Sequence, residues 1–219
     1  MATNPTASTH ERLLIGFHLD RLWHDTMGDS AGDTKHVPLR LLAEILERAR
    51  VPYALIGGLA VQVRTVEPRT TLDIDIAVRH YTDVPREVLL KAGFEHTGRH
   101  PHSDTWRAPG VGPLAARTAV QFSADDEGIA DAIARATDVE LDGVRLRVAA
   151  SADLILLKLA AAEEPTRRPS KRHHDVADVM ALLEAEPAAG SPGVLARLRE
   201  AQRRLFDTQP RSPGEPRPG

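Results

Sequence analysis

The spacing of apolar residues predicts helices at the start of the chain, followed by a buried strand. Apolar side chains recur at helical spacing between Leu13 and Trp23 and again between Pro38 and Arg50, which predicts two amphipathic helices. The run Tyr53–Ile56 is continuously apolar, as is typical of a central strand covered on both faces, and it ends at Gly57-Gly58. A short helix is expected from Leu59 to Arg64.

The next segment, residues 71–78, alternates strictly between apolar and other side chains. Leucine and isoleucine occupy one set of positions, and the other set includes Asp73 and Asp75. Side chains two residues apart on a strand point to the same face, with a spacing of roughly 6–7 Å along the strand. The pattern therefore predicts a strand with one carboxylate-bearing face.

The remainder of the chain predicts short strands and then helices. Strands are expected at Phe94–Thr97, Asp104–Arg107, Arg117–Phe122, Asp138–Leu141 and Val144–Val148. Helices are expected at Val84–Ala92, Gly128–Arg135, Leu154–Ala162, Ser170–Glu184 and Pro192–Phe206. Asp142-Gly143 is a strong hairpin signal between two of the strands. The expected class is α/β (α+β), a mixed sheet flanked by helices and followed by a helical C-terminal part.

Length and local composition divide the chain further. At ~150 residues per domain, 219 residues give one full domain with an appendage, or two small domains. We expect a core with its N-terminal helices over residues 10–150 and a helical part over 151–208. Residues 1–9 and the Pro-rich tail 209–219 are expected to be disordered, because the tail cannot bury enough surface to offset its ordering entropy.

Composition and charge exclude several classes of function. With no cysteine, the chain has no disulfides, thiolate metal sites or Cys nucleophile. The longest uncharged stretch, residues 51–63, is shorter than the ~20 residues of a membrane span, and no secretory signal is visible. The cytoplasm is therefore the expected compartment, with no membrane contact. The formal charge of −3 gives no overall basic field, so any nucleic-acid binding needs a local basic patch.

The carboxylate pair and the glycine pair carry the chemistry. Two like charges on one strand face repel each other, and a divalent cation with a preference for oxygen ligands would relieve that repulsion. Gly57-Gly58 lies between a strand and a helix, where backbone N–H groups can approach a phosphate closely. Together, Asp73, Asp75 and the two glycines are typical of metal-assisted phosphoryl or nucleotidyl transfer.

The same residues resemble the signature of a known superfamily. Leu-Ile-Gly-Gly-Leu-Ala-Val, followed by Arg-x-Thr-x-Asp-Ile-Asp, is similar to the motif of the polymerase-β-type nucleotidyltransferases, and more narrowly to the AbiEii-like toxin branch. The similarity is close over residues 50–80 and looser as far as 184. It implies a Mg²⁺- or Mn²⁺-dependent enzyme that moves an NMP from an NTP to a hydroxyl. The branch implies a tRNA 3′ end or a protein as acceptor, and an antitoxin protein as partner.

The resemblance also assigns roles beyond the glycines and aspartates. It places Lys158 on the nucleotide phosphates and Asp175 nearby as an orienting or proton-accepting group. Thr71 and Arg69 belong to the same motif, and Arg69, just before the strand, would hold the triphosphate or the acceptor, although it suits a salt bridge to an acidic neighbour equally. Periodicity alone shows only that Lys158 interrupts an apolar helical face, where an amine must reach solvent or an anion.

One position departs from the superfamily pattern. Related enzymes carry a third carboxylate on a neighbouring strand, and the matching position here is Gln121. An amide can ligate a metal through its carbonyl but cannot act as a general base. Asp125, Asp126 or Asp175 could replace the missing carboxylate. The alternative is a catalytically silent module on the same fold that binds a nucleotide or RNA.

The densest basic run, residues 167–174, offers a local patch for nucleic acid. It is either a solvated loop and helix start or a contact to an RNA backbone through Arg167, Arg168, Lys171 and Arg172. A third function, nucleotidyl transfer to a polycationic antibiotic, requires an acidic acceptor pocket, and this basic run counts against it.

Overall fold

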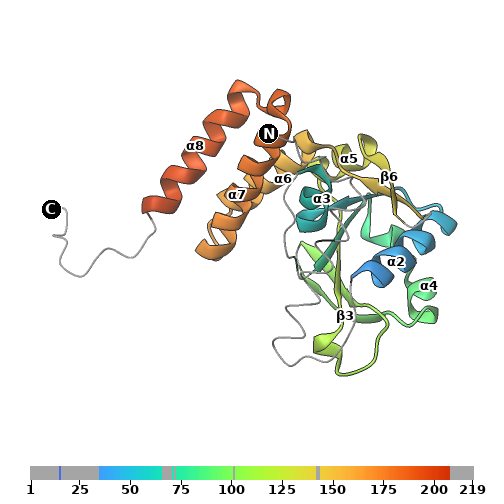
Figure 1. Ribbon diagram of the computed structural model, residues 1–219. Coiled ribbons are helices and arrows are strands. Elements are labelled where there is room, and N and C mark those ends of the chain that lie inside the picture. Colours follow the sequence, from blue (N-terminus) through green and yellow to red (C-terminus); the bar gives the residue numbers. More distant parts are fainter. Residues whose placement is uncertain are drawn as a thin grey trace, which may run out of the picture. The chain divides into compact units, whose positions relative to one another are not determined.

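The structure is a computed structural model that describes Ile15 and residues 35–65, 71, 73–100, 102–141 and 144–207 (Figure 1). The disordered ends predicted at 1–9 and 209–219 lie outside the described residues. The helix expected at Leu13–Trp23, apart from Ile15, and the Asp142-Gly143 turn lie outside them as well. The chain divides into two compact units, residues 1–154 and 155–219.

A single mixed sheet forms the centre of the first unit. Its seven strands lie side by side in the order β3-β4-β5-β2-β1-β7-β6. The strands are β1 (Tyr53–Ile56), β2 (Asp73–Val78), β3 (Glu95–His100), β4 (Ser103–Arg107), β5 (Ala119–Ser123), β6 (Thr137–Leu141) and β7 (Val144–Val148). The pairs β2–β5 and β1–β7 are parallel and the other four are antiparallel. The α/β class expected from the sequence is confirmed.

The middle of the sheet is its most apolar part. All four residues of β1 are buried, which explains why that strand is a continuous apolar run with no polar face. On β2, Ile74 and Ile76 are fully buried, whereas the alternate positions Asp73 and Asp75 are only half-buried. The outer strand β3 is almost entirely exposed, as an edge strand with polar side chains can be.

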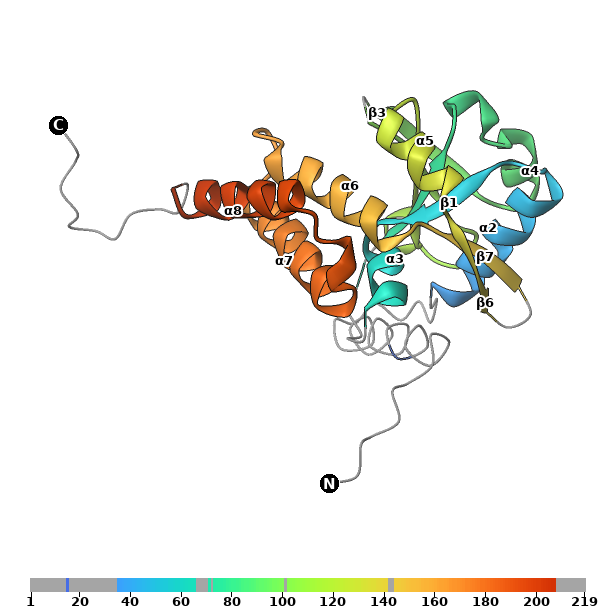
Figure 2. The ribbon, with the colours of Figure 1, turned by 90° about the horizontal axis from the view of Figure 1, so that it is seen from above.

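Helices of the first unit pack along the sheet. Their bounds are α2 (His36–Arg48), α3 (Gly57–Arg64), α4 (Arg86–Lys91) and α5 (Glu127–Ala134), with 3₁₀ turns η1 (Tyr81–Asp83) and η2 (Leu114–Ala116). Helix α2 lies along β7, and α3 packs on β1 and β2 (Figure 2). Helix α4 is shorter than the expected Val84–Ala92 because η1 and Pro85 precede it.

The second unit is helical. Helix α6 (Ser151–Glu163) begins in the first unit and continues into the second, which also contains α7 (Pro169–Ala185), η3 (Pro187–Ala189) and α8 (Pro192–Asp207). The buried residues of α8 recur at helical spacing: Val194, Leu198, Ala201 and Leu205. These helices agree with the expected ranges to within three residues. No helix in the described ranges is long and apolar enough to cross a lipid bilayer.

Candidate active site

The two carboxylates predicted to share a face do so on β2. Asp73 pairs in register with Ala119 of β5, and Asp75 lies between Ile56 of β1 and Gln121 of β5. Both aspartates are half-buried, so each carboxylate keeps access to solvent or to a ligand. The strand alternation thus aims two negative charges at one region of the sheet surface.

Gly57 brings the start of α3 into direct contact with Asp75. Helix α3 begins at Gly57, immediately after β1, and Gly57 has a φ of +68° that L side chains rarely adopt. A Cβ at this position would lie 2.0 Å from the Asp75 Oδ2 atom. The first N–H groups of a helix carry partial positive charge, which favours an anion at this end. The glycine is therefore required both by the backbone turn and by the close approach of the carboxylate.

Gln121, the residue that departs from the superfamily pattern, lies beside the two aspartates. Its Nε2 atom donates a hydrogen bond of 2.9 Å to Asp73 Oδ2, and its register partner on β2 is Asp75. Two of the three aspartates proposed as substitutes are engaged elsewhere. Asp126 caps the N-terminus of α5 through its Oδ1 atom, and the Oδ1 atom of Asp125 lies 3.0 Å from His80 Nδ1.

The donor set of this face suits a hard cation. Mg²⁺ is commonly held by one or two carboxylates, with substrate phosphates and water completing its shell. Asp73, Asp75 and the amide oxygen of Gln121 supply oxygen donors of that kind. Within the described ranges, no group of three or more His, Asp or Glu side chains is placed around one point. The face therefore offers two carboxylates and leaves the remaining ligands to the substrate.

The motif residues before β2 are only partly described. Thr71 is half-buried two residues before the strand, whereas Arg69 lies outside the described residues. Gly58, the second glycine of the motif, is buried in the first turn of α3.

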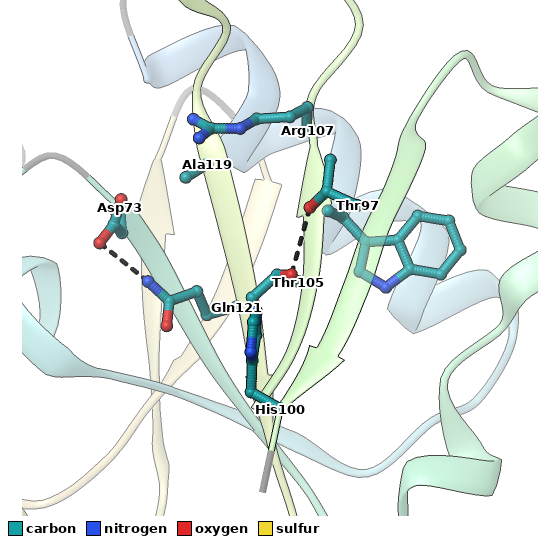
Figure 3. Close-up of a pocket in the computed structure, with 8 residues that line it drawn as sticks. Asp73, Thr97, His100, Thr105, Arg107, Ala119 and Gln121 are labelled. Atoms are coloured by element: carbon teal, nitrogen blue, oxygen red, sulfur yellow. Dashed lines mark hydrogen bonds between the residues drawn. The ribbon is translucent and has the colours of Figure 1, made fainter. Parts of the chain in front are cut away.

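A pocket of about 310 Å³ opens beside Asp73 on the same sheet face (Figure 3). The residues that line it come from β2, β3, β4 and β5: Asp73, Thr97, His100, Thr105, Trp106, Arg107, Ala119 and Gln121. Apart from Asp73 and Gln121, none of them was a candidate from the sequence. The polar alternation of Thr105 and Arg107 on β4 was visible, but its position beside Asp73 follows from strand pairing.

The residues predicted to complete the nucleotide pocket form an ion cluster in the helical unit. Lys158 Nζ lies 3.1 Å from Asp175 Oδ1 and 2.7 Å from Asp178 Oδ2. Arg167 Nε lies 2.7 Å from Asp175 Oδ2. The Asp175 side chain is 2% exposed, so two cationic side chains contact one buried carboxylate. The anion that Lys158 required is thus supplied by α7.

The basic run is split between surface and interior. Arg168 and Lys171 are exposed, and Arg167 keeps about two fifths of its side chain exposed beside Asp175. Arg172, in contrast, is buried, and its Nε atom donates a 2.6 Å hydrogen bond to the carbonyl of Ala162 near the end of α6. The predicted RNA contact of Arg172 conflicts with this burial, because its guanidinium holds α7 against α6.

The fold of the chain is similar to the folds of solved structures. An antigenic nucleotidyltransferase-like protein from Paracoccidioides brasiliensis has a similar structure, with a TM-score of 0.52 at 18% identity over 82% of this chain and 90% of that one. The antibiotic-resistance factor ANT(2″)-Ia is also similar, with a TM-score of 0.50 at 16% identity over 80% and 94%. The chain therefore has a nucleotidyltransferase-like fold. No protein-family model and no curated protein sequence matches it.

Proposed function

We propose that the protein is a metal-dependent nucleotidyltransferase that moves an NMP from an NTP to a hydroxyl acceptor. The observation that carries the proposal is the contact between Asp75 and Gly57, with Asp73 on the same strand face. This contact places a carboxylate pair next to the start of a helix. A triphosphate with a bound cation needs both, because the carboxylates bind the cation and the helix start binds the phosphates. The nucleotidyltransferase-like fold supports the same conclusion.

Each candidate site residue of the first unit has a role in this proposal. Asp73 and Asp75 would hold Mg²⁺ or Mn²⁺, and Gly57 and Gly58 let the phosphates approach the backbone at α3. A bound divalent cation polarises the reacting phosphate and neutralises charge on the leaving group. Thr71 and Arg69 belong to the nucleotide site by their place in the motif.

The proposed reaction is an in-line displacement. The acceptor oxygen forms a bond to the α-phosphorus, and the bond between that phosphorus and the oxygen bridging to the β-phosphate breaks. Pyrophosphate leaves with the electron pair, and the hydroxyl proton passes to water. In the helical unit, both oxygens of Asp175 accept from cations, which favours an orienting role for Asp175 over proton transfer. By the sequence resemblance, Lys158 would contact the nucleotide phosphates.

The narrower parts of the proposal rest on the sequence resemblance. The AbiEii-like branch suggests a toxin of a toxin–antitoxin pair, a tRNA 3′ end or a protein as acceptor, and an antitoxin as partner. Exposed Arg168 and Lys171 would supply the RNA contacts, with Arg167 beside them. A cytoplasmic location, where NTPs and Mg²⁺ are at hand, belongs to the same proposal.

A labelling experiment tests the function. The four radiolabelled NTPs are offered in turn with Mg²⁺ and a cell lysate, to the wild-type protein and to Asp73→Asn. We expect one NTP to label a macromolecular fraction with the wild type only. Equal labelling by the two proteins would refute the proposal.

The second candidate is a catalytically silent nucleotide- or RNA-binding module on the same fold. The Gln121 amide favours it, because a neutral side chain bonded to Asp73 replaces the third carboxylate. This alternative predicts saturable, Mg²⁺-dependent NTP binding with no release of pyrophosphate in the same lysate. Release of pyrophosphate would eliminate it.

A further inference from the structure

The pocket beside Asp73 is built by two rows of residues that run across the sheet. In the first row, Asp73 of β2 pairs with Ala119 of β5, which pairs with Arg107 of β4. In the second row, Asp75 pairs with Gln121, which pairs with Thr105. Because paired residues project to the same face, the carboxylates and the pocket share one surface. Neighbouring strands are ~4.8 Å apart, so the Asp73 and Arg107 backbones are about 10 Å apart.

Ala119 makes the pocket possible. It lies between Asp73 and Arg107, and its methyl group leaves open the space that a larger side chain would fill. A volume of about 310 Å³ is at the lower end of small-ligand pockets, so it takes one sugar-sized unit. Thr97 and Thr105 add hydroxyl groups, which are joined by a 3.1 Å hydrogen bond.

The ends of the pocket carry cationic or neutral donors. Arg107 NH1 donates a 2.9 Å hydrogen bond to the carbonyl of Arg117, and the guanidinium reaches across Ala119 toward the Asp73 side (Figure 3). His100 lies at the opposite end of the view. Glu95, the register partner of Arg107 on β3, is not a lining residue and pairs with Arg117 at 2.6 Å. Among the lining residues, Asp73 is the one carboxylate.

From this arrangement we propose that the pocket is the acceptor subsite and that Arg107 selects a sugar hydroxyl adjacent to a phosphate. The inference rests on the proposed nucleotidyl transfer. The acceptor hydroxyl lies next to Asp73, and its phosphate is bound by the Arg107 guanidinium, whose planar fork suits phosphate oxygens. A nucleic-acid 3′ end and a free nucleotide share this chemistry. A polycationic amino sugar does not, because Arg107 repels it.

Binding of an unreactive acceptor tests the subsite apart from catalysis. The probe is a short fluorescent RNA whose terminal nucleotide lacks the 3′ hydroxyl, measured by anisotropy in several salt concentrations. We expect Arg107→Gln to weaken binding about 10-fold and to lower the salt slope by about one, with partial rescue by Arg107→Lys. Ala119→Leu should also weaken binding, although it removes no charge. Arg48→Gln, on an exposed arginine of α2, is the matched control and should bind as the wild type does.

Transfer assays then identify the source of the acceptor. The arms are the same RNA with its 3′ hydroxyl, a free nucleoside 5′-monophosphate and a polycationic amino sugar, each with labelled NTP and Mg²⁺. Labelling of the RNA or of the nucleoside monophosphate supports the proposal if it is reduced at least 10-fold in Arg107→Gln. The arm that becomes labelled identifies the acceptor. Labelling of the amino sugar, or equal RNA binding by Arg107→Gln and wild type, overturns it.

The two proposals fail in different ways. If RNA binding depends on Arg107 and no arm is labelled, nucleotidyl transfer fails while the pocket still binds a phosphate-bearing strand. If an acceptor is labelled in a manner that requires Asp73 but not Arg107, the transfer stands and the acceptor subsite is wrong.

Discussion

Gly57 is the residue at which backbone conformation and site chemistry meet. Its φ of +68° alone costs an L residue ~1–2 kcal/mol, and a Cβ would also displace the Asp75 carboxylate. We expect Gly57→Ala to reduce nucleotidyl transfer about 100-fold, because a shift of ~1 Å in a reacting geometry has that effect. Steady-state kinetics and thermal unfolding provide the two measurements.

Gly112→Ala is the control for backbone strain. Gly112 has a φ of +96°, and a Cβ there meets no atom within 4 Å. The control should therefore lose ~1–2 kcal/mol of stability and keep its activity. Equal activity in Gly57→Ala and Gly112→Ala would show that the contact with Asp75 is irrelevant to function.

Gln121 decides how many carboxylates the site presents. Gln121→Asp adds a negative charge beside Asp73 and Asp75, so the melting temperature should fall in EDTA and recover with Mg²⁺. The added carboxylate can also accept the acceptor proton, which should raise the transfer rate at least 10-fold. Gln121→Asn is the control, because asparagine is as long as aspartate but neutral. A rate unchanged by Gln121→Asp at saturating Mg²⁺ would show that the third carboxylate has no role here.

At the residue scale, strand alternation predicted a shared face for the two aspartates, the Gly-Gly step marked the turn after β1, and the glutamine was noticed because it departs from the superfamily pattern. The sequence did not predict Arg107 or Ala119 as part of the same surface. An alanine and an arginine are ordinary on a strand, and their meaning comes from strand pairing, which places Ala119 beside Asp73, 46 positions earlier, and Arg107 beside Ala119. The burial of Arg172 was also invisible, because its partner is a backbone carbonyl.

At the scale of elements, the first turn of α6 is tied to the end of α5 by a buried carboxylate. Asp153, 2% exposed in the first turn of α6, accepts hydrogen bonds from the Nε and NH2 atoms of Arg135 at the end of α5. These hydrogen bonds raise the pKa of Arg135, so the guanidinium stays charged at any working pH. The sequence did not predict this ion pair.

Removal of Arg135 should destabilise the fold. Arg135→Met leaves the Asp153 carboxylate buried without its charged partner, so this variant should unfold at a lower urea concentration than the wild type. Asp131→Asn removes the exposed partner of the same arginine, at 3.2 Å, and should cost less than about 1 kcal/mol. If the two variants unfold at the same urea concentration, Asp153 does not depend on Arg135.

The elements themselves were largely predictable. Strict alternation identified β2 and continuous apolarity identified β1, and both patterns follow from which faces are covered. The bounds of α4 were not predictable, because the residues between the η1 turn and α4, which include Pro85, are also compatible with the start of a helix. Strand order was not predictable either, since β5 joins β2 across a segment that contains β3 and β4.

At the scale of the whole molecule, Tyr53 links stability to alkaline pH. Burial raises the pKa of Tyr53 to about 12, and its hydroxyl accepts from the backbone N–H of Arg147 on β7. Below pH 10 both the folded and unfolded chains keep the proton, so the full stability is present. Above pH 10 the Tyr53 hydroxyl loses its proton in the unfolded chain but keeps it in the folded chain, so the free energy of unfolding falls until about pH 12.

Urea unfolding at pH 9 and pH 11.5 measures this linkage. The wild type should lose about 2 kcal/mol more than Tyr53→Phe across that interval, because Phe has no proton to lose. Other groups that titrate in this range are common to both proteins and cancel. Equal losses would show that the Tyr53 hydroxyl titrates normally in the folded protein.

The account depends most on the claim that the carboxylates of β2 support transfer from an NTP. The direct measurement is the rate of pyrophosphate release with Mg²⁺, NTP and the labelled acceptor, in wild type and in Asp75→Asn of matched thermal stability. We expect the variant to be at least ~1,000-fold slower, since the lost charge stabilisation amounts to several kcal/mol. Pyrophosphate release at the same rate from both proteins would contradict the account.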